Sequence, residues 1–294
     1  MRKYWIFALL FVISSACEKE EINPIYSFGI ENKPVAIAFD GVNMWTANQE
    51  NGVTKITPDG KTTIYKGTGE WPIAIAFDGV NMWTSSGDNS VTKITPDGKM
   101  TTYKGTGKWP VAIAFDGVNM WTANNQDNSV TKITPDGKMT TYKGTDEWPV
   151  AIAFDGVNMW TANFSMATVT KITPNGEMTT YEGTGEQPCA IAFDGVNMWT
   201  ANQYCDNVTK ISPDGKMITY EGTGTYPGGI AFDGVNMWTA DYFGKSVTKI
   251  TTDGEMTIIG IDKQPSAIAF DGVNMWTANT WTATITKVPI EAIN

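Results

Sequence analysis

The chain has no histidine among its 294 residues and only three cysteines. Histidine is the usual general base near neutral pH, so its absence excludes Ser-His-Asp and Cys-His catalytic sets and histidine-based metal sites. The sequence also lacks a glycine-rich loop of the kind that holds phosphate. Acidic turns such as Asp40-Gly41 lack the alternating ligands of a calcium loop. We therefore predict no catalytic residue, no metal and no cofactor.

No stretch of the chain sustains a helical apolar period of 3.6 residues, which excludes a helical solenoid. Instead, one decapeptide, Ile-Ala-Phe-Asp-Gly-Val-Asn-Met-Trp-Thr, recurs every 38 or 39 residues. Its copies begin at Ile37, Ile75, Ile113, Ile152, Ile191, Ile230 and Ile268. Copies this alike indicate either a shared structural constraint or recent duplication.

Each repeat reads as four short strands. In the first repeat we expect strands at 36–39, 43–48, 53–57 and 62–65, separated by tight Asp-Gly and Pro-Asp-Gly turns. Four strands in about 40 residues, repeated seven times, predict an all-β, seven-bladed β-propeller of four-stranded blades.

The last repeat ends near 286–288 without a fourth strand. Residues 28–34 match 259–265 of the sixth repeat in character. We therefore expect the N-terminal strand to complete the last blade and close the ring, which also covers an exposed strand edge. Large aromatics at fixed repeat positions usually fill cores. We assign the seven repeat tryptophans to the core, with the Ile37 and Phe39 equivalents as blade-to-blade packing and the repeated Thr-Lys lysines as a structural ring.

The order Pro, two residues, Ile-Ala, Asp-Gly, a nearby Trp and then Ile-Thr-Pro-Asp-Gly resembles the repeat of the virginiamycin B lyase (streptogramin lyase) family. The resemblance covers roughly residues 22 to 294 and extends more loosely to propellers with NHL-type repeats. It implies a propeller fold. Members of the family open a cyclic antibiotic ester by magnesium-dependent elimination, using histidine and glutamate side chains. No position of this chain matches the histidines.

The N-terminus resembles a bacterial lipoprotein signal. Two basic residues precede an apolar run too short to span a bilayer, and Cys17 follows at once. We expect residues 1–16 to be the signal peptide, 17–24 the lipidated Cys17 and a tether, and 25–294 the propeller. The four residues after Cys17 resemble a surface-export tag. These features predict an outer-membrane lipoprotein, periplasmic or surface-exposed, that meets the membrane only through its lipid; ordinary secretion with cleavage near Ala16 is the alternative.

Removal of Arg2 and Lys3 with the signal leaves 19 basic and 31 acidic residues, a net charge of −12. This charge opposes nucleic-acid binding, and we expect a monomer. The mature chain keeps Cys189 and Cys205 near one rim of the fifth blade. In an oxidising compartment they can form a disulfide or remain free thiols.

Variation between repeats is concentrated in two sets of loops that share one face of a propeller. These loops carry aromatic residues beside acids such as Asp88, Asp127, Asp206 and Asp241. Rigid aromatics give large contact area at low entropic cost, so the pattern favours a surface that binds a glycan, peptide or protein. Loops also vary freely, and a tryptophan before proline can simply cover the neighbouring blade. The predicted ligand-binding residues are Trp71, Trp109, Trp148, Phe164, Tyr204, Tyr226, Tyr242, Phe243 and Trp281.

Three functions follow from these features. The first is a non-catalytic, lipid-anchored propeller that binds a ligand or partner through its variable aromatic face. The second is a metal-dependent lyase or hydrolase that uses carboxylates. The third is a purely structural repeat protein.

Overall fold

The computed structural model describes residues 25–30, 33–50 and 52–290. The predicted signal peptide at 1–16, the lipidated Cys17 and the whole tether at 17–24 lie outside these residues. Within the described ranges, no helix is long and apolar enough to cross a membrane.

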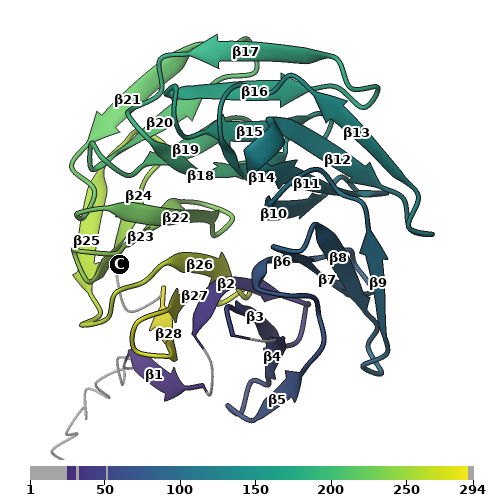
Figure 1. Ribbon diagram of the computed structural model, residues 1–294. Coiled ribbons are helices and arrows are strands. Elements are labelled where there is room, and N and C mark those ends of the chain that lie inside the picture. The colour runs from purple at the N-terminus through teal and green to yellow at the C-terminus, as the bar shows by residue number, and fades with distance from the viewer. Residues whose placement is uncertain (1–24, 31–32, 51, 291–294) are drawn as a thin grey trace, which may run out of the picture.

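Seven four-stranded antiparallel sheets form a ring (Figure 1), and the predicted seven-bladed, all-β propeller is confirmed. The first three blades, numbered outward from the axis, are β2 (Pro34–Phe39), β3 (Met44–Asn48), β4 (Val53–Ile56), β5 (Thr62–Tyr65); β6 (Pro72–Phe77), β7 (Met82–Ser86), β8 (Ser90–Ile94), β9 (Met100–Lys104); and β10 (Pro110–Phe115), β11 (Met120–Asn124), β12 (Ser129–Ile133), β13 (Met139–Lys143), with a short 3-10 helix, η1 (Asn125–Asp127).

The remaining blades repeat this order. They are β14 (Pro149–Phe154), β15 (Met159–Asn163), β16 (Thr168–Ile172), β17 (Met178–Glu182); β18 (Pro188–Phe193), β19 (Met198–Asn202), β20 (Asn207–Ile211), β21 (Met217–Glu221); β22 (Pro227–Phe232), β23 (Met237–Asp241), β24 (Ser246–Ile250), β25 (Met256–Gly260); and β26 (Ala267–Phe270), β27 (Asn274–Asn279), β28 (Thr284–Pro289), β1 (Tyr26–Gly29).

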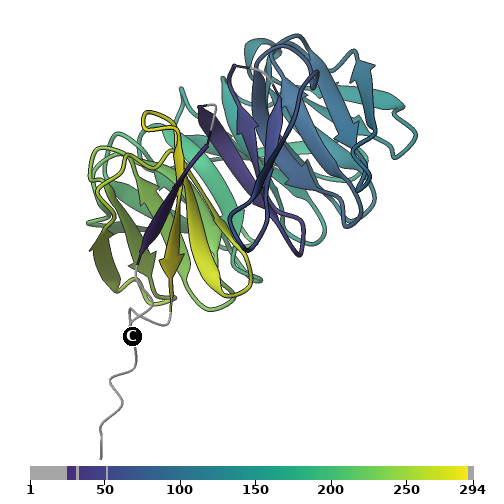
Figure 2. The same ribbon diagram turned by 90° about the horizontal axis from the view of Figure 1, so that it is seen from below.

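The ring closes through the N-terminal strand, as predicted. Strand β1 pairs antiparallel with β28, from Tyr26 opposite Lys287 to Gly29 opposite Thr284. Figure 2 shows purple β1 beside the yellow C-terminal strands. Phe28 of β1 stacks on Trp276 at 5.9 Å between ring centroids. The two ends of the chain therefore share one blade, and the seventh blade depends on contacts between them.

The repeated Asp-Gly turn is built around one carboxylate in each blade. In the first blade Asp40 accepts the backbone N–H groups of Val42 and Asn43 at 2.8 and 2.6 Å, while Gly41 takes φ 91°. The indole N–H of Trp45 donates to the same carboxylate at 2.6 Å. The turn residue thus also fixes the orientation of the core tryptophan.

The repeat tryptophans pack between blades, as predicted. Trp45 is almost fully buried and packs against Ile75, Met82 and Ile94 of the second blade. Its ring also stacks on Tyr65 of its own outer strand, at 5.3 Å. Burial of roughly 200 Å² of indole at about 25 cal/mol per Å² contributes about 5 kcal/mol per tryptophan before entropic costs. The same arrangement recurs around the ring.

The repeat lysines cover the outer side of these tryptophans. In six blades the ammonium lies over the indole of the same blade, 5.4–5.7 Å from its centroid. Lys93 also donates to the carbonyl of Pro135 in the next blade, at 3.4 Å. The lysines therefore combine a cation–π contact with a link between blades, which is a structural role.

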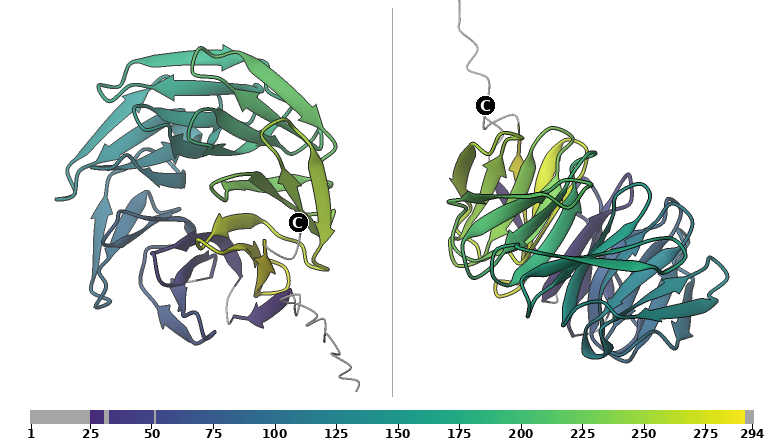
Figure 3. Two further views of the ribbon diagram at one scale, coloured as in Figure 1. Left: turned by 180° about the vertical axis from the view of Figure 1, so that it is seen from behind. Right: turned by 90° about the horizontal axis from the view of Figure 1, so that it is seen from above.

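The strands run between the two faces of the disc, which Figure 3 shows from behind and from above. The loop after the second strand of a blade is hydrogen-bonded to the segment that enters the same blade. Gly87 donates to the Trp71 carbonyl at 3.1 Å, and Phe164 donates to the Trp148 carbonyl at 2.9 Å. Both variable sets of loops therefore lie on one face, here called the loop face. The repeated Asp-Gly and Pro-Asp-Gly turns form the turn face.

Candidate functional site

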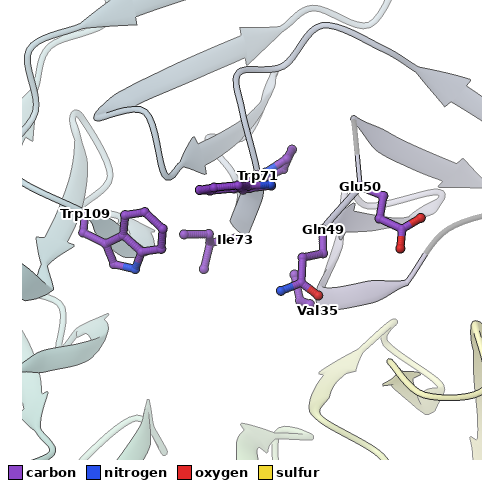
Figure 4. Close-up of a pocket in the computed structure, with 7 residues that line it drawn as sticks. Val35, Gln49, Glu50, Trp71, Ile73 and Trp109 are labelled. Carbon is purple, nitrogen blue, oxygen red and sulfur yellow. The ribbon is translucent and has the colours of Figure 1, made fainter.

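A cavity of about 730 Å³ opens on the loop face and contains two of the predicted residues, Trp71 and Trp109. We call it the Trp71–Trp109 pocket. Trp71 and Trp109 stand directly before the prolines that begin β6 and β10. The lining is completed by residues of the first two blades, drawn in Figure 4: Val35, Gln49, Glu50, Pro72 and Ile73. None of these five was among the predicted ligand-binding residues.

The two indoles form a corner. Their ring centroids are 6.0 Å apart and the ring planes are inclined by 61°. The side chain of Trp71 is 57% exposed. Gly87 makes this contact feasible, because a Cβ at that position would lie 3.0 Å from the Trp109 ring and 3.4 Å from the Trp71 ring. The other blades have side chains at this position, so the glycine is a signal in the sequence that marks this pair.

The backbone at the tryptophans is unusual. Trp71, Trp109 and Trp148 have φ values of 55°, 57° and 57°, in the left-handed region that bulky residues rarely adopt. Holding a side chain there costs on the order of 1–2 kcal/mol relative to the right-handed region. The loop geometry imposes this conformation at five blade entries, where Gln187 and Tyr226 share it with the three tryptophans, and a glycine would meet it at lower cost. The tryptophans are therefore not explained by the backbone.

A polar side chain of the preceding blade supports several of these aromatics. Asn89 accepts the backbone N–H of Trp109 at 2.8 Å, and Asn128 accepts that of Trp148 at 3.2 Å. Asp206 accepts the N–H of Tyr226 at 2.7 Å. Each of these loop residues itself lies in the left-handed region, which Asn and Asp tolerate. The acids and amides of the loops thus position the aromatics, a role that the sequence did not reveal.

The polar groups of the pocket lie on one side of it. In Figure 4, Trp71 lies in the middle. Gln49 and Glu50 lie on one side of it, and Trp109 lies on the opposite side. The Glu50 carboxylate lies 3.4 Å from the Lys33 ammonium, and both side chains are more than half exposed. The pocket therefore offers aromatic and aliphatic surface with a neutral amide and an ion pair at its rim.

Three further predicted residues form a second group, here called the blade-6 aromatic cluster. Tyr226, before β22, lies 4.7 Å from Phe243 and 6.1 Å from Tyr242, and the last two rings are 5.0 Å apart. Phe243 is 58% exposed. The structure thus joins Tyr226 to two adjacent residues that follow it about 16 positions later in the chain.

The other four predicted residues stand alone. Trp148, Tyr204 and Trp281 are exposed and Phe164 is half-buried on the loop face. Among the residues that the structure describes, none of their rings contacts either aromatic group. The predicted set is therefore two clusters with isolated aromatics between them, and not one continuous surface.

The acids near the aromatics differ in environment. Asp241, expected on the exposed face, is fully buried at the end of β23. It accepts hydroxyl hydrogen bonds from Thr239, Ser246 and Thr248 at 2.7, 3.0 and 2.7 Å. Burial raises the pKa of this carboxyl to about 6, although the three hydroxyl bonds oppose the shift. Asp241 is therefore an internal group and cannot contact a ligand directly.

The structure records Cys189 and Cys205 as free thiols, and both are half-buried. The disulfide that their positions in the sequence allow stays a prediction. The Cys189 sulfur lies 3.0 Å from the carbonyl of Pro227 in the next blade, so it faces that blade instead of the loop that holds Cys205. Burial raises the pKa of the Cys189 thiol to about 12. In the part of the chain described, no three Cys, Asp or Glu side chains are grouped so that they could hold a metal ion.

Comparison with known proteins assigns the family. The family model described as "Virginiamycin B lyase family" matches residues 25–223 and 69–292. The chain belongs to the virginiamycin B lyase family. No curated protein sequence matches the chain significantly.

Solved structures share the fold at low sequence identity. A selenomethionine-substituted virginiamycin B lyase from Staphylococcus aureus matches with a TM-score of 0.80 and 19% identity, over 91% of this chain and 99% of the other. A catalytically inactive histidine-to-alanine variant of the S. aureus lyase with quinupristin matches equally well, at 20% identity, over 91% and 99%. The WD40 propeller domain of Doa1 has a TM-score of 0.79 and 11% identity, over 90% and 95%. These likenesses concern the fold alone.

Proposed function

We propose that this protein is a non-catalytic glycan-binding propeller that holds its ligand on the loop face. The observation that carries the proposal is the Trp71–Trp109 pocket. An exposed indole face suits the flat apolar face of a pyranose ring, and Gln49 and Glu50 provide hydrogen-bonding groups for its hydroxyls. A volume of about 730 Å³ lies within the usual range of ligand pockets.

The chemistry of the chain supports a role without catalysis. The inactive S. aureus lyase variant lacks a histidine that the active enzyme has. This chain has no histidine at all. The strained tryptophans, whose indoles the backbone does not require, support binding as the function that retained them. In this proposal the propeller acts as a monomer on the outer membrane, anchored through Cys17 and facing the periplasm or the cell exterior.

Binding can be tested by titrating uncharged oligosaccharides and cell-wall fragments into the purified protein and following heat and tryptophan fluorescence. The Trp71→Ala/Trp109→Ala variant should bind at least about 30-fold more weakly, the loss typical of a pair of central aromatic contacts. Trp281→Ala is the matched control, because Trp281 is an exposed loop-face tryptophan outside the pocket. Equal affinity of the wild type and the double variant, or binding to no glycan, would refute the proposal.

Family membership favours one alternative, a lyase that uses carboxylates with a metal ion. Its test is incubation with quinupristin and Mg²⁺, followed by mass spectrometry, since opening of the ring by elimination leaves the mass unchanged but alters fragmentation and retention. Turnover that Glu50→Gln abolishes would establish this alternative and refute the non-catalytic role. If neither binding nor turnover is found, the purely structural role remains.

A further inference from the structure

The two aromatic groups lie on opposite sides of the ring. Trp71 and Trp109 enter the second and third blades, and Tyr226 enters the sixth. The point midway between the second and third blades is three and a half steps from the sixth blade, which is half of a ring of seven. Because all three residues directly precede the innermost strands, both groups border the axis on the same face.

Between the two groups lies the mouth of the axial channel. The channel has a volume of about 230 Å³, and its first ring of residues directly follows the blade-entry prolines. On the side of the Trp71–Trp109 pocket this ring has Val35, Ile73 and Val111. On the side of the blade-6 aromatic cluster it has Gly228 and Ser266. The mouth is therefore apolar and bulky on one side and open on the other.

Glycine at 228 is not required by packing. A Cβ there would meet its nearest neighbour, the Ser266 carbonyl oxygen, at 3.5 Å, which is an ordinary contact. The next residue differs, because a Cβ at Gly229 would lie 3.1 Å from the Cα of Ala267. Gly229 thus serves blade packing, whereas Gly228 leaves space in front of the aromatic cluster.

We propose that the ligand is an extended, uncharged glycan chain that crosses the channel mouth. One end rests in the Trp71–Trp109 pocket, the middle passes over Gly228 and Ser266, and the other end stacks on Tyr226, Tyr242 and Phe243. This inference rests on the proposed function and adds a second contact to it. Two weak contacts on one chain bind more tightly than either alone, because the second contact forms within the complex.

The charges near the site favour an uncharged chain. The protein has a formal net charge of −10. The cation of the pocket rim, Lys33, is paired with Glu50, and Asp206 lies under the blade-6 aromatic cluster. A polyanionic glycan would approach the Glu50 and Asp206 carboxylates on a protein that is negative overall, which disfavours its binding. Neutral chains with flat sugar faces fit both groups.

The test is the dependence of affinity on chain length, measured by calorimetry with β-1,4-linked N-acetylglucosamine oligomers of one to six units. For the wild type we expect affinity to rise at least tenfold between the shortest oligomer that binds and the longest. The Tyr226→Ala/Tyr242→Ala/Phe243→Ala variant should bind the short oligomer like the wild type and lose the increase. Tyr204→Ala, an exposed aromatic outside both groups, should leave it unchanged.

A second variant keeps the test informative if the triple variant fails to fold. Gly228→Val introduces the residue found at the equivalent positions 111 and 150. This substitution changes no residue of either aromatic group, so it should weaken the binding of the long oligomers only. If affinity is independent of length, or if both variants keep the wild-type increase, the crossing mode is wrong while glycan binding stands. If no oligomer binds, or only an extended peptide does, the crossing mode and the proposed glycan function fall together.

Discussion

The indole N–H of Trp160 donates a hydrogen bond of 2.7 Å to the carboxylate of Asp155, five residues earlier in the chain. The same carboxylate also accepts hydrogen bonds from the backbone N–H groups of Val157 and Asn158, at 2.8 and 2.5 Å. Equivalent Asp–Trp pairs occur in all seven blades. One carboxylate therefore closes a turn and orients a core side chain, which explains why both residues recur together.

Asp155→Ala should destabilise the protein by about 2 kcal/mol, because it leaves the indole N–H and two turn N–H groups without their acceptor. Urea unfolding at pH 7 measures this loss. Val157→Ala is the control, since Val157 is exposed in the same turn and its truncation should cost little. An equal effect of both substitutions would show that the carboxylate is not the organising group.

The same carboxylates predict loss of stability in acid. In five of them burial alone would raise the pKa, but hydrogen bonds from the asparagine three residues later and from the indole N–H outweigh it and lower the pKa below its usual value of 3.8; these are Asp40, Asp78, Asp116, Asp155 and Asp194. A lowered pKa stabilises the folded state above the unfolded value, and this contribution is lost as the pH falls through the folded value. The contribution of these carboxylates to the urea midpoint should therefore be constant from pH 7 to 5, and the midpoint should fall as the pH drops below about 4. Asp155→Asn should have a weaker acid dependence than the wild type.

Asp241→Asn should stabilise the protein at pH 8. The folded pKa of Asp241, about 6, exceeds the ordinary value of 3.8, so its contribution to stability is complete below 3.8 and lost as the pH rises through 6. Neutralising the side chain should raise the free energy of unfolding by about 2–3 kcal/mol at pH 8 and leave it unchanged at pH 3. Asparagine fits the site, because Asn124 donates to the equivalent hydroxyls of Ser129 and Thr131 in the third blade.

The control for this prediction is the reverse exchange in the fifth blade. Asn202 donates to Asn207 and Thr209, so Asn202→Asp should introduce the same penalty above pH 6. Thermal unfolding followed by circular dichroism at several pH values measures both. A pH-independent effect of either substitution would contradict the assignment.

Trp71→Gly should be more stable than Trp71→Ala by about 1 kcal/mol, the reverse of the usual order. The reason is the left-handed backbone at this residue, φ 55°, which glycine adopts without the steric cost that a Cβ adds. Both variants lose the indole, so their difference isolates the backbone. Urea unfolding of the two variants at pH 7 measures the difference in their free energies of unfolding. A more stable alanine variant would mean that the loop relaxes.

Phe28→Ala should destabilise the ring closure by about 3 kcal/mol, because Phe28 of β1 stacks on Trp276 and packs in the core between the seventh and first blades. Limited proteolysis should then cleave near the N-terminal strand first. Tyr26→Ala, on an exposed position of the same strand, is the control. Equal protease resistance of wild type and Phe28→Ala would show that the closing strand is held by its backbone pairing alone.

Much of the fold could be predicted because the same pattern of strands and turns occurs in seven repeats. The Asp-Gly turns, the β-branched third strands and the tryptophan of each copy indicated a propeller, and the match of residues 28–34 to 259–265 indicated how it closes. The site was harder. The position of Trp71 and Trp109 on one face followed from topology, but their contact depends on Gly87, and the roles of Asn89 and Asn128 depend on the preceding blade.

The sequence by itself determined the number of blades, the strands of each and the face on which variation is found, because these follow from local turn chemistry and periodicity. Only the tertiary structure decided which aromatics meet and which acid is buried. These outcomes depend on contacts between residues on different strands or in different blades, such as Trp71 with Trp109 and Asp241 with Thr248. At such contacts a few tenths of an ångström decide whether two rings touch or a carboxylate loses its water. Local patterns carry no information on such distances.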